Sequence, residues 1–196
     1  MLFTKARLTR PVLAAVETRV DIPATPVTFM LFHVSEDRTI EVFKPRHSDR
    51  SDKTPAVWAI DADHLRNYLL PRDCPRVTFY AGPATSDADR RQFLGSRHAV
   101  VAIERDWFRR LSAYRLYCYH LPPRTFTCVD ECAGYFTSAV AVAPVYIEWI
   151  DHPLRELRRR GGSVQGMPSL WSLHDAIAAS TLQFSMIRMR NAKPRR

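Results

Sequence analysis

Met30-Leu-Phe-His-Val-Ser-Glu-Asp-Arg-Thr-Ile-Glu-Val-Phe-Lys-Pro-Arg46 is the stretch that decides the fold of this chain. Apolar runs at its start and at residues 40–43 flank a polar turn at residues 36–39, a pattern that predicts two short strands. His33 and Ser35 stand two apart at the end of the first strand, so their side chains project from one face and can meet one ligand. The structural alternative is that His33 bonds a neighbouring backbone group while Ser35 caps the turn.

Downstream of this stretch the sequence predicts further short strands at near-regular spacing. Apolar or alternating runs predict strands at residues 56–60, 76–81, 98–103, 114–120, 134–138 and 145–150. A longer helix is predicted over residues 168–187, near the C-terminus. Strands and helices do not alternate regularly. We therefore expect an α+β fold with a strand-rich mixed or antiparallel sheet core, a few short helices and one longer C-terminal helix.

The length of the chain predicts one domain. Its 196 residues, of which 46% are hydrophobic, are enough to bury one good core. We expect residues 1–29 to be an N-terminal extension that the fold does not need, residues 30–187 to be a single globular domain, and residues 188–196 to be a basic tail. No uncharged apolar run reaches the length of a membrane span of about 18 residues. We therefore expect no contact with a membrane.

Positive charge is concentrated at the ends of the chain. The formal net charge is +9, of which residues 186–196 contribute +5 and residues 1–29 contribute +2. A basic tail of this kind predicts either weak, nonspecific contact with nucleic acid or a contribution to solubility.

The four cysteines predict a cytoplasmic protein with reduced thiols, because neither a secretory signal nor a dense cysteine framework accompanies them. Cys128 and Cys132 have the spacing of half a metal site, but no second pair with nearby histidines completes it, so we expect no metal. The six glycines form neither a dinucleotide fingerprint nor a phosphate-binding loop of the Walker type.

Six short strings carry a resemblance to a known family. They are Leu31-Phe-His-Val-Ser35, Phe43-Lys-Pro-Arg46, Val57-Trp-Ala-Ile-Asp61, Leu69-Leu-Pro-Arg-Asp-Cys-Pro-Arg-Val-Thr-Phe-Tyr80, Ser169-Leu-Trp171 and Phe184-Ser-Met-Ile-Arg-Met-Arg-Asn191. With these strings the chain resembles a family of short uncharacterised microbial proteins known only as a domain of unknown function. The resemblance covers nearly the whole predicted domain. It implies no activity.

A second, more distant resemblance rests on the order of Phe32-His-Val-Ser35, Phe43-Lys-Pro45 and Val57-Trp-Ala-Ile60, followed by a short helix that carries Tyr68. This order is similar to that of the ADP-ribosyltransferase-like fold. There, a strand with Tyr-His-Gly-Ser/Thr precedes a strand end with proline, a Val-Phe-Ala-Thr strand and a short helix. The resemblance implies that His33 and Ser35 contact NAD and that Tyr68 or Trp58 stacks on its nicotinamide.

The same fold usually carries a glutamate on a late strand, where it stabilises the charge that develops in the transition state. Gly134 stands at the corresponding place here, and Glu131 lies three residues earlier. Glu131 is therefore the candidate catalytic residue, on condition that a bulge or another register carries it to the pocket. The implied function is an ADP-ribosyltransferase-like domain that binds NAD or a related nucleotide, with its usual glutamate out of place.

Three arginines suggest a second hypothesis for the function. Some members of this wider superfamily act on RNA phosphate with histidine and arginines in place of the glutamate, and Arg46, Arg72 and Arg76 lie in loops or at strand ends near the predicted pocket. The alternative for each arginine is a solvated loop charge. The rival functions are thus an RNA-phosphate-directed enzyme, a non-catalytic nucleotide-binding module, and a structural or interaction protein.

Overall fold

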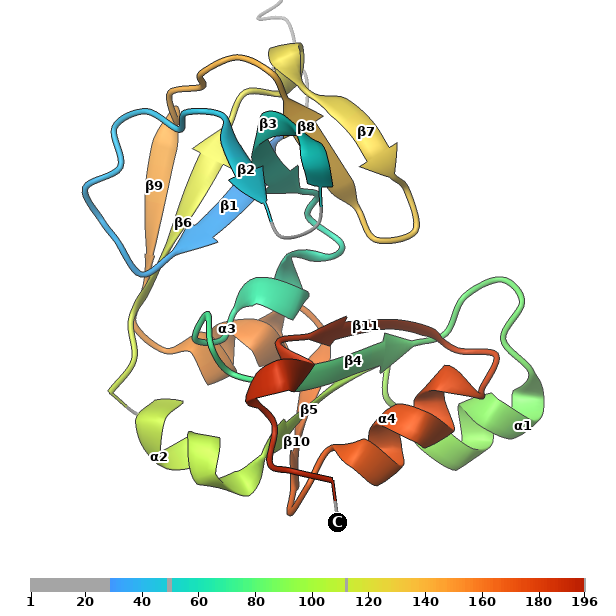
Figure 1. The fold of residues 1–196 in the computed structure, drawn as a ribbon. Helices are drawn as coiled ribbons and strands as arrows, with labels where there is room; N and C mark the ends of the chain where they lie inside the picture. Colours follow the sequence, from blue (N-terminus) through green and yellow to red (C-terminus); the bar gives the residue numbers. More distant parts are fainter. Residues whose placement is uncertain (1–28, 49–50, 112, 196) are drawn as a thin grey trace, which may run out of the picture.

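Two β-sheets, one above the other in Figure 1, form the body of the protein. The computed structural model describes residues 29–48, 51–111 and 113–195. Of the predicted N-terminal extension, residues 1–28 lie outside this described part. The predicted α+β class, with a strand-rich core and a few short helices, is confirmed.

The first sheet is antiparallel throughout, in the order β7-β8-β3-β1-β6-β9, with β2 paired to β3. Its strands are β1 (Leu31–Ser35), β2 (Arg46–Ser48), β3 (Ser51–Ile60), β6 (Leu116–Leu121), β7 (Thr127–Asp130), β8 (Tyr135–Ser138) and β9 (Tyr146–Ile150). β1 lies at the centre of this sheet, so the opening stretch of the sequence is the element around which it is built.

The second sheet has four strands in the order β10-β5-β4-β11. They are β4 (Arg76–Tyr80), β5 (Ala99–Glu104), β10 (Gly162–Met167) and β11 (Gln183–Ile187). β10 runs parallel to β5, and the other two pairs are antiparallel. Every residue of β4 and β5 is buried, which explains why β5 reads as a continuous apolar run rather than an alternating one.

The helical segments are short, and all except η4, which precedes β7 of the first sheet, lie around the second sheet (Figure 1). They are η1 (Leu65–Tyr68), α1 (Asp87–Asp89), η2 (Arg90–Leu94), η3 (Arg105–Trp107), α2 (Phe108–Leu111), η4 (Pro123–Thr125), α3 (Pro153–Arg159), α4 (Trp171–Ala178) and η5 (Met189–Asn191). η1 and α3 lie between the two sheets, whereas α1 and α4 lie on the far side of the second sheet. Among the described residues, no helix is long and apolar enough to cross a membrane.

Apolar side chains form three clusters that follow these layers. The cluster between the sheets joins Phe32 and Ile60 of the first sheet to Val101 of the second and Leu157 of α3. A second cluster lies under the second sheet, where Val77, Phe79, Val100, Leu170 and Ile177 meet. A third covers the outer face of the first sheet and contains Leu31, Phe43, Val57, Tyr119 and Val142.

The predicted strand at residues 40–43 is wrong. Only Phe43 makes a sheet-like contact, through paired backbone hydrogen bonds with Val142 of 2.8 and 2.9 Å. Residues between β1 and Phe43 form a loop instead, which Tyr119 holds by donating its hydroxyl to the carbonyl of Asp37 at 2.7 Å. The partners of this segment therefore come from far along the chain.

The longer C-terminal helix is also wrong. α4 ends at Ala178, and Gln183–Ile187 form strand β11 against β4. The helix stops because Thr181 is bound to α1: its backbone N–H donates to the Asp89 carboxylate at 2.7 Å. Beyond this contact the chain is extended.

The segment after β11 packs against the second sheet. Lys193 donates its backbone N–H to the buried Glu104 carboxylate at 2.9 Å, and its amine lies 2.7 Å from Asp106. Arg195 forms two hydrogen bonds with Asp175 and lies over the Trp171 ring. Two cations of the predicted basic tail are thus engaged with acids of the protein itself, while nucleic-acid contact by this segment stays a prediction.

Candidate functional site

The backbone ladder at the centre of the first sheet is interrupted between β1 and β3, and we call this interruption the opening. β1 pairs with β6 along all its residues, but its pairing with β3 is confined to Phe32 and Ile60. Past that pair the two strands separate, and the His33 side chain reaches across: its Nδ1 lies 2.8 Å from the carbonyl oxygen of Trp58. A side chain thus makes the contact that a main-chain ladder makes elsewhere in the sheet.

His33 is neutral at this position. Burial lowers the pKa of its imidazole, the hydrogen bond to Trp58 raises it, and the nearby charges of Arg72 and Arg46 lower it further. A neutral ring that donates from Nδ1 to the Trp58 carbonyl keeps Nε2 as a hydrogen-bond acceptor. The Phe43 ring, 4.7 Å from that of His33, packs against it.

Arg46 and Arg72 reach this opening from different segments. Arg46 lies on β2, opposite Ala56 of β3. Arg72 follows η1, and its backbone N–H donates to the Glu36 carboxylate at 2.9 Å, which ties it to the end of β1. Both side chains are exposed, and neither guanidinium forms an ion pair with a described residue. Two of the three predicted arginines are therefore available to an anion beside His33.

Because its pKa is lowered, His33 makes the folded protein less stable in acid. Between that lowered pKa and about 6.5, the unfolded chain binds a proton that the folded protein does not, so stability rises with pH through this window. We expect the unfolding free energy of the protein to fall, relative to that of His33→Asn, by at most about 1.4 kcal/mol per pH unit on acidification. Asparagine is chosen because it keeps a donor toward Trp58 without titrating. Urea unfolding of both proteins from pH 5 to 8 measures the difference, and parallel curves would contradict the prediction.

Ser35 caps the turn that follows β1. Its hydroxyl oxygen accepts the backbone N–H of Asp37 at 3.1 Å, and Asp37 in turn accepts the N–H of Thr39 at 2.8 Å. The structural alternative considered for Ser35 is the arrangement observed. Contact of this hydroxyl with a ligand stays a prediction.

An aromatic chain links β3 to η1. The Trp58 ring meets Tyr135 of β8 edge-on at 6.0 Å, and the hydroxyls of Tyr68 and Tyr135 are 2.8 Å apart. The indole Nε1 of Trp58 is buried and has no hydrogen-bond partner among the described residues. A buried donor without an acceptor costs about 1 to 3 kcal/mol. It is therefore a position where a bound polar group would add stability.

Arg76 is a structural residue rather than a solvated loop charge. Its side chain is only 2% exposed. The guanidinium donates to the carbonyls of Asn67, Pro71 and Cys74 at 2.7, 3.1 and 2.9 Å, and it lies over the Tyr68 ring at 5.9 Å. Burial lowers the pKa of Arg76, yet an arginine remains charged. These bonds fix the backbone on both sides of Arg72, so Arg76 helps to position Arg72.

Glu131 lies in the turn between β7 and β8, where its side chain is exposed. Its carbonyl accepts the backbone N–H of Gly134 at 3.3 Å. Gly134 has a positive φ of 66°, and a Cβ there would overlap His64 and Asp61. The glycine is therefore required for close packing, and the catalytic role of Glu131 stays a prediction.

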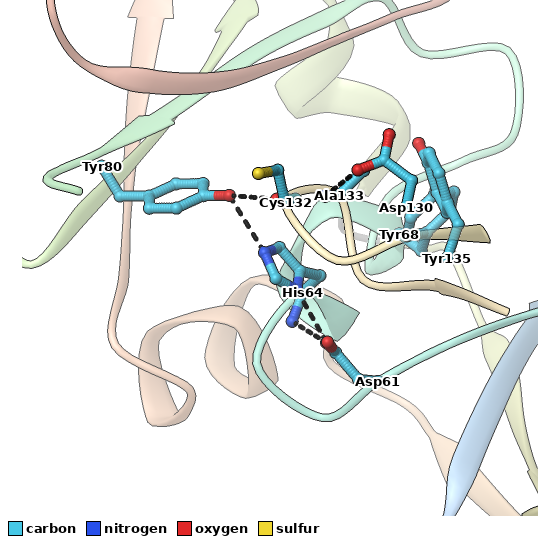
Figure 2. Close-up of polar contacts among 8 residues, drawn as sticks. All are labelled: Asp61, His64, Tyr68, Tyr80, Asp130, Cys132, Ala133 and Tyr135. Carbon is cyan, nitrogen blue, oxygen red and sulfur yellow. Dashed lines mark hydrogen bonds and ion pairs between the residues drawn. The ribbon is translucent and has the colours of Figure 1, made fainter. Parts of the chain in front are cut away.

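A second polar group, absent from our sequence predictions, lies beside this turn (Figure 2). The Asp61 carboxylate is 2.7 Å from His64 Nδ1, and His64 Nε2 is 3.0 Å from the Tyr80 hydroxyl. That hydroxyl also donates to the carbonyl of Cys132 at 3.3 Å. Burial raises the pKa of Tyr80, so its phenol is protonated at neutral pH. The group joins the start of η1, the second sheet and the β7–β8 turn. Only the Asp61–His64 spacing of a helix cap was visible in the sequence.

Two hollows open on the surface near these elements. One of about 240 Å³ lies beside Tyr80, Cys132 and Phe184, next to the polar group in Figure 2. The other, of about 480 Å³, lies between residues 38–41 and 144–147 at the edge of the first sheet. Neither hollow is lined by the predicted site residues. Of these residues, Arg46 and Arg72 lie near His33 at the opening between β1 and β3, whereas Glu131 lies in the β7–β8 turn.

The comparison with protein families agrees with this extent of ordered fold. The model of a family described as a family of unknown function, DUF6886, matches residues 32–192. The chain belongs to this family. The match runs from the second residue of β1 to just past η5, so it covers both sheets and the opening at His33, whereas Lys193 and Arg195 lie beyond it. No curated protein and no solved structure matches the chain. The resemblance to the ADP-ribosyltransferase-like fold has no support from these comparisons and stays a prediction.

Proposed function

We propose that the protein binds a nucleotide or a similar phosphate ester at the opening between β1 and β3, with NAD as the ligand that the distant resemblance implies. One observation carries the proposal: the strands separate around a neutral His33, with the charges of Arg46 and Arg72 beside it. A strand opening that held only structural groups would not need two cations at its rim.

The groups at the opening suit the parts of a nucleotide. The acceptor nitrogen of His33 takes a hydrogen bond from a ribose hydroxyl, and arginine binds phosphate through paired N–H groups. Tyr68 and Trp58 remain the aromatic candidates for stacking on a base or a nicotinamide, although their linked rings lie on the inner face of the first sheet while His33 packs against Phe43 on the outer face.

A second candidate function is a phosphate-directed reaction, in which His33 accepts a proton and the arginines stabilise charge on phosphate. The neutral state of His33 between two cations favours it. The exposed position of Glu131 in the β7–β8 turn favours it over a transferase that needs this glutamate. We propose binding first, because it requires no catalytic role for either Glu131 or His33.

Ligand-dependent stability tests the proposal. We expect NAD, ADP-ribose or AMP to raise the unfolding free energy of the full chain, by about 2.7 kcal/mol at 100 times the dissociation constant. Arg72→Ala and His33→Asn should weaken this stabilisation at least tenfold in ligand concentration. Arg91→Ala is the control, because Arg91 is an exposed arginine on η2, beyond the second sheet.

Absence of stabilisation by all three ligands at millimolar concentration would overturn nucleotide binding. If binding is found, Glu131→Gln separates the two reactions. Nicotinamide release from NAD that disappears in this variant supports the glutamate-dependent transferase. Phosphate release from phosphorylated RNA that survives in Glu131→Gln but disappears in Arg46→Ala supports the phosphate-directed reaction.

A further inference from the structure

A thiol, an imidazole and a carboxylate meet on the inner face of the first sheet, away from His33. Cys118 and His120 stand two apart on β6, so their side chains project from the same face. Glu148 of β9 lies directly opposite Cys118 in the antiparallel register. One ligand atom from each of the three residues lies within 4.8 Å of the other two. Among the described residues, this is the only such group of three or more metal-binding side chains.

The imidazole of His120 is unsatisfied where it faces this group. Its Nε2 is buried without a hydrogen-bond partner among the described residues, and the nearest Glu148 oxygen is 3.5 Å away. The Phe32 and Tyr146 rings pack edge-on against the imidazole at 4.9 and 5.1 Å and so fix its direction. A ring nitrogen without a hydrogen-bond partner, held in place toward a thiol and a carboxylate, suits the role of a metal ligand.

We propose that Cys118, His120 and Glu148 bind one zinc ion, with water in the fourth position. Sulfur, nitrogen and oxygen ligands together suit zinc, whose bonds of about 2.0 to 2.3 Å place tetrahedral ligands about 3.3 to 3.8 Å apart. The separation of His120 Nε2 and Glu148 Oε2, 3.5 Å, already falls in this range. Small rotations of the Cys118 and Glu148 side chains complete the set.

The three proposed ligands differ in their exposure to solvent, as expected for a zinc site that is open on one side. Cys118 is fully buried, whereas the side chains of His120 and Glu148 are 22% and 28% exposed. β9 is the outer strand of the sheet (Figure 1), so the ion and its water reach the ligands from that edge. Three protein ligands with one solvent position are typical of zinc sites that activate water.

Arg160 approaches the same Glu148 oxygen that faces His120, but at a longer distance than its contact with Glu156. Its Nε donates to Glu156 at 2.7 Å, whereas its Nη2 is 3.7 Å from Glu148 Oε2. The guanidinium is therefore held chiefly by Glu156 on α3. In this place it orients Glu148 as groups beyond the ligands do in other metal sites.

The sequence prediction of no metal considered only Cys128 and Cys132. Both are exposed in the structure. The zinc ligands were hidden because Glu148 joins Cys118 through strand register rather than through sequence spacing. This site is independent of the proposed nucleotide site, since Cys118 and His120 alternate with Tyr119, which lies opposite His33.

Cobalt(II) substitution tests the proposal on the full chain, stripped with chelator and kept reduced. We expect one cobalt ion per chain, with visible d–d bands of a tetrahedral site and a near-ultraviolet thiolate charge-transfer band. Zinc should displace the cobalt, and magnesium should not. Cys118→Ser should abolish the charge-transfer band, and Glu148→Gln should weaken cobalt binding at least tenfold.

Cys74→Ser is the matched control, because Cys74 is equally buried in the same apolar cluster but has no metal-binding neighbours. It should leave cobalt binding unchanged. Absence of the charge-transfer band in the original protein would overturn the proposal. So would a band that survives Cys118→Ser, or one that disappears only in the double variant Cys128→Ser and Cys132→Ser. If Cys118→Ser does not fold, unchanged cobalt affinity in the nearly isosteric Glu148→Gln would overturn it alone.

Discussion

We expect Arg76→Met to lose about 3 kcal/mol or more of unfolding free energy, because three backbone carbonyls lose their donor at once and each buried, unpaired acceptor costs about 1 to 3 kcal/mol. The carbonyls belong to Asn67, Pro71 and Cys74. No described carboxylate is paired with this guanidinium, so the loss comes from the backbone carbonyls and from the contact with the Tyr68 ring. Methionine fills similar volume, which keeps a cavity from contributing.

Urea unfolding measures this effect. Arg72→Met is the control in the same segment, because the Arg72 side chain is exposed, and it should change stability by less than about 0.5 kcal/mol. Arg76→Lys should fall between the two variants, since an ammonium keeps the charge but not the planar set of donors. If Arg76→Met were as stable as Arg72→Met, the carbonyls would have other partners and the supporting role assigned to Arg76 would be wrong.

Gly134→Ala is expected to be nearly as damaging, at about 3 kcal/mol. The positive φ of 66° costs an alanine about 1 to 2 kcal/mol. The added methyl group would also overlap the Asp61–His64 pair, and overpacking of this kind costs about 1 to 3 kcal/mol more. The Tyr80 contact of His64 shown in Figure 2 should be lost with it.

Gly161→Ala separates the two costs. Gly161 has a similarly positive φ of 76° but no atom within 4 Å of an added Cβ, so it should lose only the backbone share of about 1 to 2 kcal/mol. In thermal unfolding each kcal/mol corresponds to about 2 to 4 °C for a chain of this size. Equal midpoints for the two variants would show that the turn moves aside and that Gly134 is not needed for packing.

The sequence predicted those elements whose apolar pattern has only one interpretation. β5 is an uninterrupted apolar run, and the structure buries all of it. The end of the chain was ambiguous, because Leu182, Phe184 and Met186 suit a strand face while helix-forming residues precede them. The contact of Thr181 with Asp89, which decides between helix and strand, joins residues too far apart for a local pattern to reveal.

The candidate site divides in the same way. His33 could be singled out from its own strand, but its bond to Trp58 depends on the separation of β1 from β3. Arg76 was grouped with Arg46 and Arg72 because a residue type says nothing about burial. Its carbonyl partners carry no side-chain signal at all. Polar groups that strand register or main-chain contacts bring together therefore cannot be predicted from a single sequence.

The two sheets are interleaved along the chain, and this order constrains synthesis. The chain passes from β3 of the first sheet to β4, returns from β5 to β6, and leaves again from β9 to β10 (Figure 1). On the ribosome, β5 emerges long before β10, its parallel neighbour, has been translated. Strand pairings between distant segments form slowly, and apolar strands that await partners promote aggregation. A nascent chain that ends before Gly162 should therefore aggregate more readily than the full chain.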